Sequence, residues 1–402
     1  MPHMPLRPSL VPATAGEVFA LIREGRVTTR TDVGRLTGLS RTAVTARLST
    51  LLEAGLVVED DEGPSTGGRP PARLRFDTDA GVVLAVAVGR SRTQLAVCDL
   101  AGEVLVAEDV DQEVGVAPDE LMPELAERLG HLLEQAGRPV ADVKGVGVSI
   151  PGTVDYERGA SLDSPIMVGW DGVVLAPYLT GGAVGIEAPV YVDNDANVMA
   201  LSERHGHLER LDNVLLVKAS TGLGAGIVSG GVLQRGALGA AGEIGHTKTP
   251  AAEGVVCRCG DVGCVEAVAG GWALVRALRE QGREVGHIRD LVALALNGDA
   301  EARRLLRESG RRLGEVIAGA VNLLNPEAVV IGGDMALAYD SLVAGLRETV
   351  YANATALSTR QLDILPTTHG ERSGVVGCAA MVLEEILAVR AVDRAVAARS
   401  QA

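Results

Sequence analysis

Short apolar runs of strand length recur from about residue 80 onward and alternate with segments of helical periodicity. The runs lie at residues 82–88, 145–150, 190–192, 214–217 and 328–331. Runs of this length and composition are typical of buried strands, and residues 95–98 are expected to pair with the first run as a hairpin. Residues 121–133 and 375–392 have the apolar spacing of helices. Strands that alternate with helices predict an α/β fold.

The length and composition of the chain are those of a folded protein with more than one domain. A chain of 402 residues is too long for one ordinary domain and suits two or three. Hydrophobic residues make up 47% of the sequence and charged residues 22%, so sizeable cores can form and global disorder is excluded. The α/β pattern follows an N-terminal domain that we place at residues 13–77.

The N-terminal domain carries a different pattern, in which three short helices precede two strands. Residues 29–32 fit a capping box that opens the second helix, and Gly38 ends it. Ser40 is the expected N-cap of the third helix. Strands follow at residues 57–58 and 73–76. Helix, helix, tight turn, helix and hairpin is the order of a winged helix-turn-helix, which predicts DNA binding.

The third helix of this domain has an apolar stripe and a polar face. We expect the polar face to read the major groove of double-stranded DNA while the stripe packs on the first two helices. A polar face of an ordinary solvated helix is the competing interpretation. Arg69, between glycines and prolines in or just after the wing, is expected to lie along the minor groove, unless this segment is only a linker. The candidate major-groove residues are Arg41, Thr42, Thr45 and Arg47.

The distribution of charge supports this division. The formal net charge of −15 argues by itself against nucleic acid. The first 75 residues, however, contain ten arginines against eight acidic residues, so nearly all of the negative charge lies in the rest of the chain. Aromatic residues make up only 2% of the sequence, which argues against stacking on single-stranded nucleic acid. The asymmetry indicates a nucleic-acid-binding module joined to an acidic partner domain.

Three of the five cysteines lie within eight residues, which is a metal-binding spacing. One imidazole and three thiolates make a closed tetrahedral site that suits structural zinc, with no open position for a catalytic water. The competing interpretation is a set of free buried thiols beside a surface histidine. Cys98 and Cys378 are expected to be small buried residues. The candidate zinc ligands are His246, Cys257, Cys259 and Cys264.

The segments around these ligands resemble the signature of the ROK family (repressors, open reading frames and kinases). They are Gly-Glu-Ile-Gly-His at 242–246 and Cys-x-Cys-Gly-x-x-Gly-Cys-x-Glu at 257–266. Further stretches that resemble the family lie at residues 151–155, 193–197, 221–226, 325–326 and 331–333. The helix-turn-helix with Gly-Gly-Arg-Pro at 67–70 resembles the repressor branch. The resemblance extends from about residue 13 to 395.

The resemblance implies two actin-like (RNase H-like, sugar-kinase) lobes with a sugar cleft between them. The lobes would be residues 78–200, completed by the helix at 375–392, and residues 201–374 with the zinc motif. Carboxylates are strong, rigid acceptors for vicinal hydroxyls, and His246 could bind zinc through one nitrogen and a sugar through the other. The residues that the resemblance assigns to the sugar are Asn194, Asp195, Glu243, His246 and Glu266.

The first phosphate loop of the family's kinases is degenerate in this chain. The family pattern Asp-x-Gly-Gly-Thr has Ala87 in place of the Asp that helps to hold the metal-nucleotide, and Arg90 in place of the second Gly. We therefore expect no ATP or magnesium cofactor and no catalytic residue, with Asp195 kept as a vestigial base that still binds a hydroxyl. Arg90 could itself hold an anion, which leaves a sugar phosphate open as effector.

The sequence thus predicts a repressor of carbohydrate genes that releases its operator when a monosaccharide or sugar phosphate binds. Half-site symmetry predicts a homodimer or a dimer of dimers. The N-terminus has no signal-peptide pattern and no stretch is expected to span a membrane, so a cytoplasmic location is expected. Three alternatives stay open: an active ATP-dependent sugar kinase with an added DNA-binding domain, a repressor controlled by a protein partner, and an activator.

Overall fold

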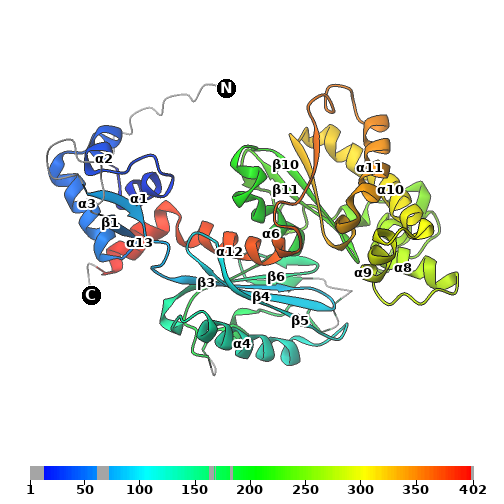
Figure 1. Ribbon diagram of the computed structural model, residues 1–402, viewed down its shortest axis with the longest axis horizontal. Coiled ribbons are helices and arrows are strands. Elements are labelled where there is room, and N and C mark those ends of the chain that lie inside the picture. The colour runs from blue at the N-terminus through cyan, green and yellow to red at the C-terminus, as the bar shows by residue number, and fades with distance from the viewer. Residues whose placement is uncertain (1–12, 61–71, 163–166, 168, 182–183, 400–402) are drawn as a thin grey trace.

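The computed structural model describes residues 13–60, 72–162, 167, 169–181 and 184–399. An N-terminal helical unit lies at one end of the molecule, and the rest is built around two five-stranded sheets with helices packed on them (Figure 1). Within the described ranges, no helix is long and apolar enough to cross a membrane.

The N-terminal unit consists of three helices and a two-stranded hairpin. The elements are α1 (Ala15–Arg23), α2 (Arg30–Thr37), α3 (Arg41–Glu53), β1 (Val57–Asp60) and β2 (Arg73–Phe76). Thr29 and Ser40 cap α2 and α3, although the Asp32 carboxylate accepts from the Thr29 hydroxyl, so only half of the predicted capping box forms. Gly38 ends α2 in the left-handed conformation that glycine adopts without strain. Phe19 packs edge-to-face on Phe76 with ring centroids 5.2 Å apart, which joins α1 to the hairpin. The element order is that of the predicted winged helix-turn-helix.

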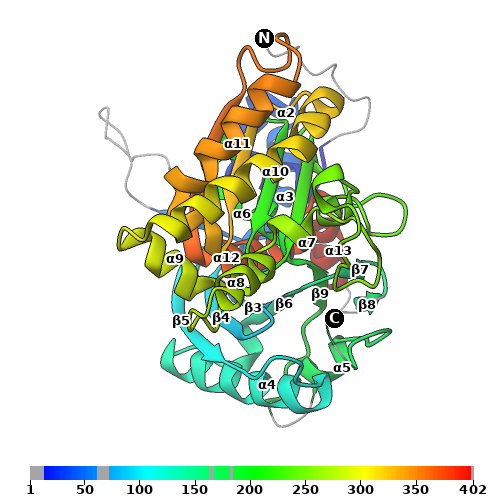
Figure 2. The ribbon, with the colours of Figure 1, turned by 90° about the vertical axis from the view of Figure 1, so that its right-hand side faces the viewer.

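The first sheet is covered by a helix on each face. Its strands are β3 (Val82–Val88), β4 (Arg92–Asp99), β5 (Val104–Asp111), β6 (Val143–Ile150) and β9 (Val190–Asn194), in the order β5-β4-β3-β6-β9. Helix α4 (Pro118–Gln135) lies under one face (Figures 1 and 2), and α12 (Ser373–Ile386) packs on the other. The fully buried run of β3 therefore meets apolar side chains on both sides.

The second sheet repeats this arrangement. Its strands are β10 (Val214–Ala219), β11 (Leu223–Ser229), β12 (Val232–Leu233), β13 (Ala328–Gly332) and β14 (Asp363–Pro366), in the order β12-β11-β10-β13-β14. In both sheets three antiparallel strands are followed by two parallel ones. The repeated topology gives two lobes of one type, and the predicted two-lobed α/β fold is confirmed.

Several shorter helices and strands lie outside the two large sheets. They are β7 (Thr153–Asp155), β8 (Ala160–Leu162), α5 (Ala176–Leu179), α7 (Glu266–Ala269), α8 (Gly271–Glu280) and α9 (Ile288–Leu296). Helix α6 (Asp195–Ser202) packs between the second sheet and α12. A Cβ on Gly377 of α12 would lie 1.9 Å from the Val198 carbonyl oxygen, so only glycine permits this close crossing of α12 and α6.

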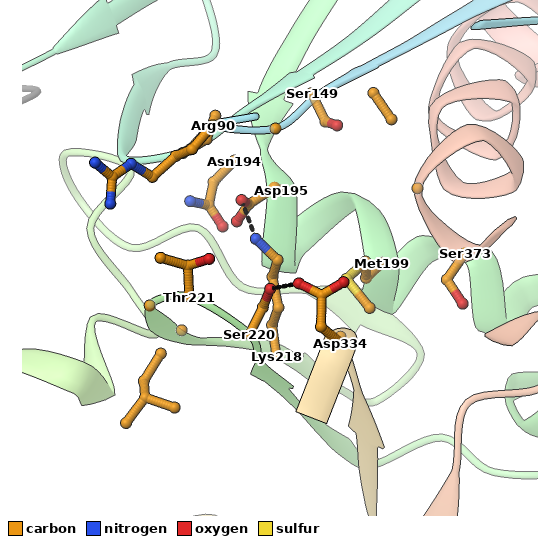
Figure 3. A pocket seen from close by; sticks show the side chains of 18 of the residues that line it. Arg90, Ser149, Asn194, Asp195, Met199, Lys218, Ser220, Thr221, Asp334 and Ser373 are labelled. Carbon is orange, nitrogen blue, oxygen red and sulfur yellow. Dashed lines mark hydrogen bonds and ion pairs between the residues drawn. The ribbon is translucent and has the colours of Figure 1, made fainter. Parts of the chain in front are cut away.

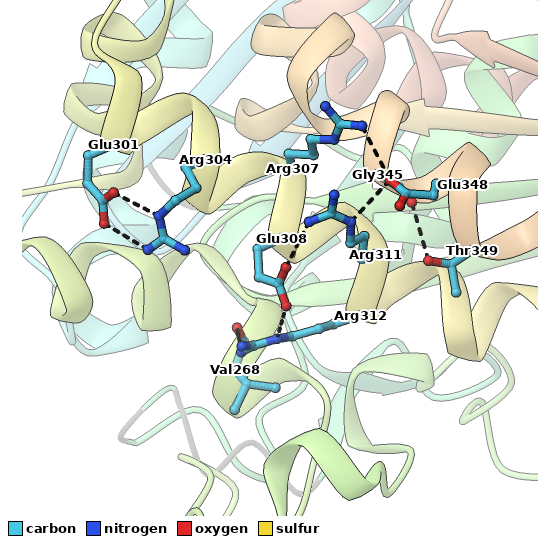
Figure 4. Close-up of polar contacts among 10 residues, drawn as sticks. All are labelled: Val268, Glu301, Arg304, Arg307, Glu308, Arg311, Arg312, Gly345, Glu348 and Thr349. Atoms are coloured by element: carbon cyan, nitrogen blue, oxygen red, sulfur yellow. Dashed lines mark hydrogen bonds and ion pairs between the residues drawn. The ribbon is translucent and has the colours of Figure 1, made fainter.

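Helices α10 (Ala300–Leu324) and α11 (Tyr339–Asn353) cover the outer face of the second sheet. A Cβ on Gly345 would lie 1.9 Å from the Arg307 carbonyl oxygen, so the two helix backbones touch. Charged pairs surround this contact (Figure 4). The Arg311 guanidinium is 3.2 Å from the Glu308 carboxylate on its own helix and 3.1 Å from the Glu348 carboxylate on α11. The arginines of this surface are thus paired with carboxylates.

The C-terminal helix differs from the prediction of one helix at residues 375–392. Helix α12 ends at Ile386, and a second helix, α13 (Val389–Arg399), begins after a two-residue break. The break redirects the chain, so Val392 and Val396 join the apolar core of the N-terminal unit. No glycine or proline marks the break, and tertiary packing outweighs the continuous helical pattern.

Helix α13 is joined to the N-terminal unit by specific contacts. The Gly16 amide donates to Asp393 Oδ1 at 2.8 Å, and Arg399 donates to the Ala54 carbonyl at 2.9 Å. A Cβ on Gly16 would lie 2.2 Å from the Val389 carbonyl oxygen, so α1 and α13 are in backbone contact. The last helix of the chain thus belongs structurally to the first unit.

Candidate functional site

A cavity of about 340 Å³ lies between the two lobes. Its walls come from the turn after β3, the start of α6, the end of β10 and the segment around Glu243. Figure 3 shows side chains from both lobes that face this space. All five residues expected to contact a sugar line it: Asn194, Asp195, Glu243, His246 and Glu266.

Asn194 is held rigidly at the N-terminus of α6. Its Oδ1 accepts from the amides of Ala196 and Asn197 at 2.8 and 3.3 Å, and its Nδ2 donates to the Gly152 carbonyl at 2.8 Å. A carboxamide that caps a helix in this way satisfies free amides of the first turn. The second Nδ2 hydrogen is left to donate to a ligand in the cleft.

Asp195 forms an ion pair with Lys218, which stands at the end of β10 (Figure 3). Both side chains are mostly buried, with 16% and 25% of their surfaces exposed. Lys218 is not among the residues predicted for the site from the sequence. The sequence feature that could have identified Lys218 is a charged residue near the end of an otherwise apolar strand. A charged side chain buried at such a position requires a partner of opposite charge.

Glu243 and His246 lie side by side at the cleft wall. Glu243 Oε1 accepts from the Thr153 hydroxyl at 3.4 Å, and its Oε2 is 3.9 Å from His246 Nε2. Burial raises the pKa of the Glu243 carboxyl, while His246 acts in the opposite direction. Thr153 belongs to the first lobe and Glu243 to the second, so their contact crosses the cleft.

Glu266 is buried beneath the turn between β10 and β11. Its Oε2 accepts from the Leu223 amide at 2.8 Å, and its Oε1 accepts from the Trp272 indole at 3.2 Å. A Cβ on Gly222 would lie 2.8 Å from the same carboxylate, so glycine lets the turn approach it. The carboxylate is thus fixed, with lone pairs left for ligand hydroxyls.

The four candidate zinc ligands come together behind this wall. One ligand atom from each of them lies within 4.8 Å of all the others, and His246 Nδ1 is 3.9 Å from Cys257 Sγ. The Lys248 ammonium is 3.1 Å from Cys264 Sγ, where it would offset thiolate charge. Since Nδ1 of His246 faces the sulfurs and Nε2 faces Glu243, the imidazole links the cluster to the cleft.

Ala87 and Arg90 of the degenerate phosphate loop line the same cavity. A second polar pair in the cavity wall was not anticipated from the sequence: the Ser220 hydroxyl donates to Asp334 (Figure 3). Both residues follow strand ends, at the edge of the sheet where ligands bind in open α/β folds. In Figure 3 the Arg90 guanidinium points away from Asp195 and Lys218.

The polar face of α3 is only partly free. Arg41, Thr42 and Thr45 are exposed, whereas Arg47 donates from Nε to the Ala13 carbonyl at 3.2 Å. The buried side of the helix is formed by Val44, Leu48 and Leu51. Arg69, the expected minor-groove residue, lies outside the described residues.

Comparison with known proteins extends over both parts of the chain. A family model described as "ROK family" matches residues 83–385. The xylose repressor of Caldicellulosiruptor bescii is 29% identical over 384 residues, which are 92% of this chain and 95% of that protein. The match therefore includes the N-terminal unit as well as the two lobes.

Solved structures give the same result. A ROK family transcriptional regulator, described as a homologue of the Escherichia coli MLC protein, superposes with a TM-score of 0.77 and 27% identity over 95% of this chain and 98% of that one. A ROK family glucokinase from Streptomyces griseus, solved with glucose and AMPPNP, superposes with a TM-score of 0.64 and 28% identity over 75% of this chain and 99% of that one. The chain belongs to the ROK family.

Proposed function

We propose that this protein is a transcriptional repressor that binds operator DNA through its N-terminal unit and senses a monosaccharide or a sugar phosphate in the cleft. The proposal rests on two features that occur in one chain. The helix-turn-helix has an exposed polar face, and the cleft is lined by all five expected sugar-binding residues. The similarity to a xylose repressor over 92% of the chain supports it, because that match includes the DNA-binding unit.

The cleft residues have complementary roles toward a sugar. The carboxylates of Asp195, Glu243 and Glu266 would accept hydrogen bonds from hydroxyls, and Asn194 and His246 would donate to hydroxyl oxygens. The fixed orientation of Asn194 and Glu266 means that little ordering entropy is lost on binding. A cleft that selects hydroxyl-rich ligands would make DNA binding by this protein respond to a carbohydrate.

We infer that the cleft does not transfer phosphate. Ala87 offers no carboxylate for a metal-nucleotide, and Lys218 holds the Asp195 carboxylate that would take a proton from the attacking hydroxyl. Incubation with ATP, magnesium and a panel of monosaccharides should release no ADP above background. Sugar-dependent ADP release would instead support the alternative of a working kinase with an added DNA-binding domain.

The His-Cys cluster fits a structural zinc ion. Three thiolates and one imidazole are ligands that zinc prefers, and one ligand atom from each of the four residues lies within 4.8 Å of the others. Bound zinc would contribute folding energy and hold His246 in place. The role of the ion in this proposal is to fix one wall of the cleft.

Helices α12 and α13 offer a route from the cleft to the DNA-binding unit. Ser373 and Gly374 at the start of α12 line the cavity, and α13 contacts α1 through Gly16 and Asp393. A sugar that draws the lobes together would shift α12 and thereby α1. In a homodimer or dimer of dimers the two recognition helices must lie roughly 34 Å apart on DNA, so a small rotation is enough for release.

Fluorescence anisotropy tests the proposal directly. The purified protein is titrated onto DNA from upstream of its own gene, and monosaccharides and their phosphates are then added. We expect tight, salt-sensitive binding that one ligand abolishes. Glu243→Ala should keep the DNA affinity and lose the ligand response. Binding that no ligand alters would favour control by a protein partner, and a normal response in Glu243→Ala would refute the assignment of the sugar site.

A further inference from the structure

A second cavity, of about 390 Å³, adjoins the cleft. The two cavities share a wall formed by Arg90, Ser91, Thr221 and His287. The far side of the second cavity comes from α8 and from the cysteine loop, which contribute Trp272, Arg276, Arg279 and Arg258. A ligand in the cleft therefore lies next to this second cavity, on the other side of the shared wall.

The lining of this second cavity is strongly cationic. It includes four arginines and, among the described residues, no aspartate or glutamate. The whole chain has a formal net charge of −15, so a cavity with four arginines and no acidic residue in its described lining contrasts with the general composition. A concentration of one charge inside a concave surface focuses the electrostatic potential and attracts the opposite charge.

Two of the four arginines are already engaged with the protein. Arg279 donates to the carbonyls of Val285 and Gly286 at 2.6 and 3.0 Å. Arg276 donates to the Ala267 carbonyl at 3.3 Å and lies 3.8 Å from the Glu280 carboxylate. These two arginines add positive charge but have few donors left for a ligand.

The other two, Arg90 and Arg258, have donors to spare. Within the part of the chain that the structure describes, neither guanidinium has an ion pair, and the buried Nε of Arg90 has no hydrogen-bond partner. Arg258 stacks over the Trp272 ring, 4.5 Å from its centroid, which orients the guanidinium without using its N–H groups. The arginines of α10 differ, since Arg307 and Arg311 face the Glu348 carboxylate (Figure 4).

Neutral donors complete the shared wall. His287 Nδ1 accepts from the Arg289 amide at 3.2 Å, so its Nε2 carries the proton and lies 3.4 Å from both the Ser91 and Thr221 hydroxyls. A partly buried guanidinium with no directly paired acid is costly even with the Glu266 carboxylate nearby, and a planar guanidinium matches two oxygens of a phosphate. The cavity thus offers the charges and hydrogen-bond donors that an oxyanion needs.

We propose that this second cavity binds the phosphate group of a phosphorylated sugar whose hydroxyls occupy the cleft. The proposal rests on the proposed sensor function and narrows its ligand class. Arg90 is close enough to Glu266 for their charges to interact, so one ligand can reach the sugar-binding acid and the anion-binding arginines together. The carboxylate of a sugar acid is also an oxyanion that arginines bind, so the experiment below compares phosphorylated sugars with sugar acids.

Isothermal titration calorimetry of the full chain without DNA tests this inference independently of any DNA response. The probes are inorganic phosphate, a set of monosaccharides, their phosphate monoesters and the corresponding uronic acids. We expect a phosphate monoester to bind at least tenfold more tightly than its parent sugar. Arg258→Gln and Arg90→Gln should each remove about tenfold or more of that difference, because each deletes charge-assisted hydrogen bonds. Arg304→Gln, which removes an exposed arginine paired with Glu301, is the charge-matched control and should bind as the parent protein does.

Each outcome decides the proposal. A monoester preference that falls in both cavity variants and persists in the control supports it, and circular dichroism melting verifies that the variants fold. Equal affinity for sugars and monoesters, a preference for uronic acids, or a preference unaffected by both substitutions overturns it. Loss of the ligand effect on DNA with monoester binding retained would refute the sensor function alone.

Discussion

Lys218 Nζ donates to Asp195 Oδ2, so the carboxylate at the start of α6 is already ion-paired in the protein without a ligand. The two residues come from different lobes of the fold, since α6 follows the first sheet and β10 belongs to the second. The pair therefore neutralises the carboxylate that the family resemblance assigns as a vestigial base, and it also joins the lobes within the cleft.

Replacement of Lys218 by Met should destabilise the protein by about 1–3 kcal/mol, because it leaves a mostly buried carboxylate unpaired. Urea unfolding measures the change. Asp195→Asn in the same background should recover part of the loss, since it removes the uncompensated charge. Strictly additive effects of the two substitutions would show that the pair has no net coupling.

Arg41→Ala should weaken operator binding by about 1–3 kcal/mol, which is roughly 5- to 150-fold. The Arg41 side chain is exposed at the first turn of α3, so the melting temperature should not change. Anisotropy at fixed salt gives the affinity, and Arg304→Ala on α10 removes the same charge far from α3 as a control. An unchanged affinity would mean that this face of α3 does not contact DNA.

If the His-Cys cluster holds the zinc ion proposed above, loss of that ion should loosen the cleft as well as the cysteine loop. Cys259→Ala should abolish stoichiometric zinc in native mass spectrometry and lower the melting temperature by several degrees, because bound zinc contributes to folding free energy. Cys98→Ala, at a buried cysteine outside the cluster, should keep the zinc. Full zinc occupancy in Cys259→Ala would contradict the four-ligand site.

Gly16→Ala should uncouple the two parts of the protein. The new Cβ would lie 2.2 Å from the Val389 carbonyl oxygen, so α13 must move away from α1. We expect the ligand concentration needed for half-release of DNA to rise several-fold. Gly319→Ala is the matched control, since a Cβ at this position of α10 meets nothing within 4 Å. An unaltered release curve for Gly16→Ala would exclude α13 as the route of coupling.

Local signals made much of the fold predictable. Thr29, Ser40 and Gly38 delimit the helices of the N-terminal unit by hydrogen bonds and backbone angles that depend on neighbouring residues. The short spacing of the three cluster cysteines made their convergence foreseeable, and the structure brings them together with His246. The five sugar-site candidates line one cavity, although their role in binding stays a prediction.

Contacts between distant segments could not be read from the same signals. Lys218 and Asp195 are 23 positions apart, and Gly16 and Asp393 are 377 apart. The end of α12 at Ile386 has no local marker, and the meeting of Arg90 with Arg258 depends on how the two lobes face each other. The sequence by itself determined most of the core strands, the caps of the N-terminal helices and the metal-binding spacing, because these depend on interactions over a few residues. Only the tertiary structure decided which buried charges have an ion pair and which have none among the described residues, because that depends on packing between segments far apart in the chain.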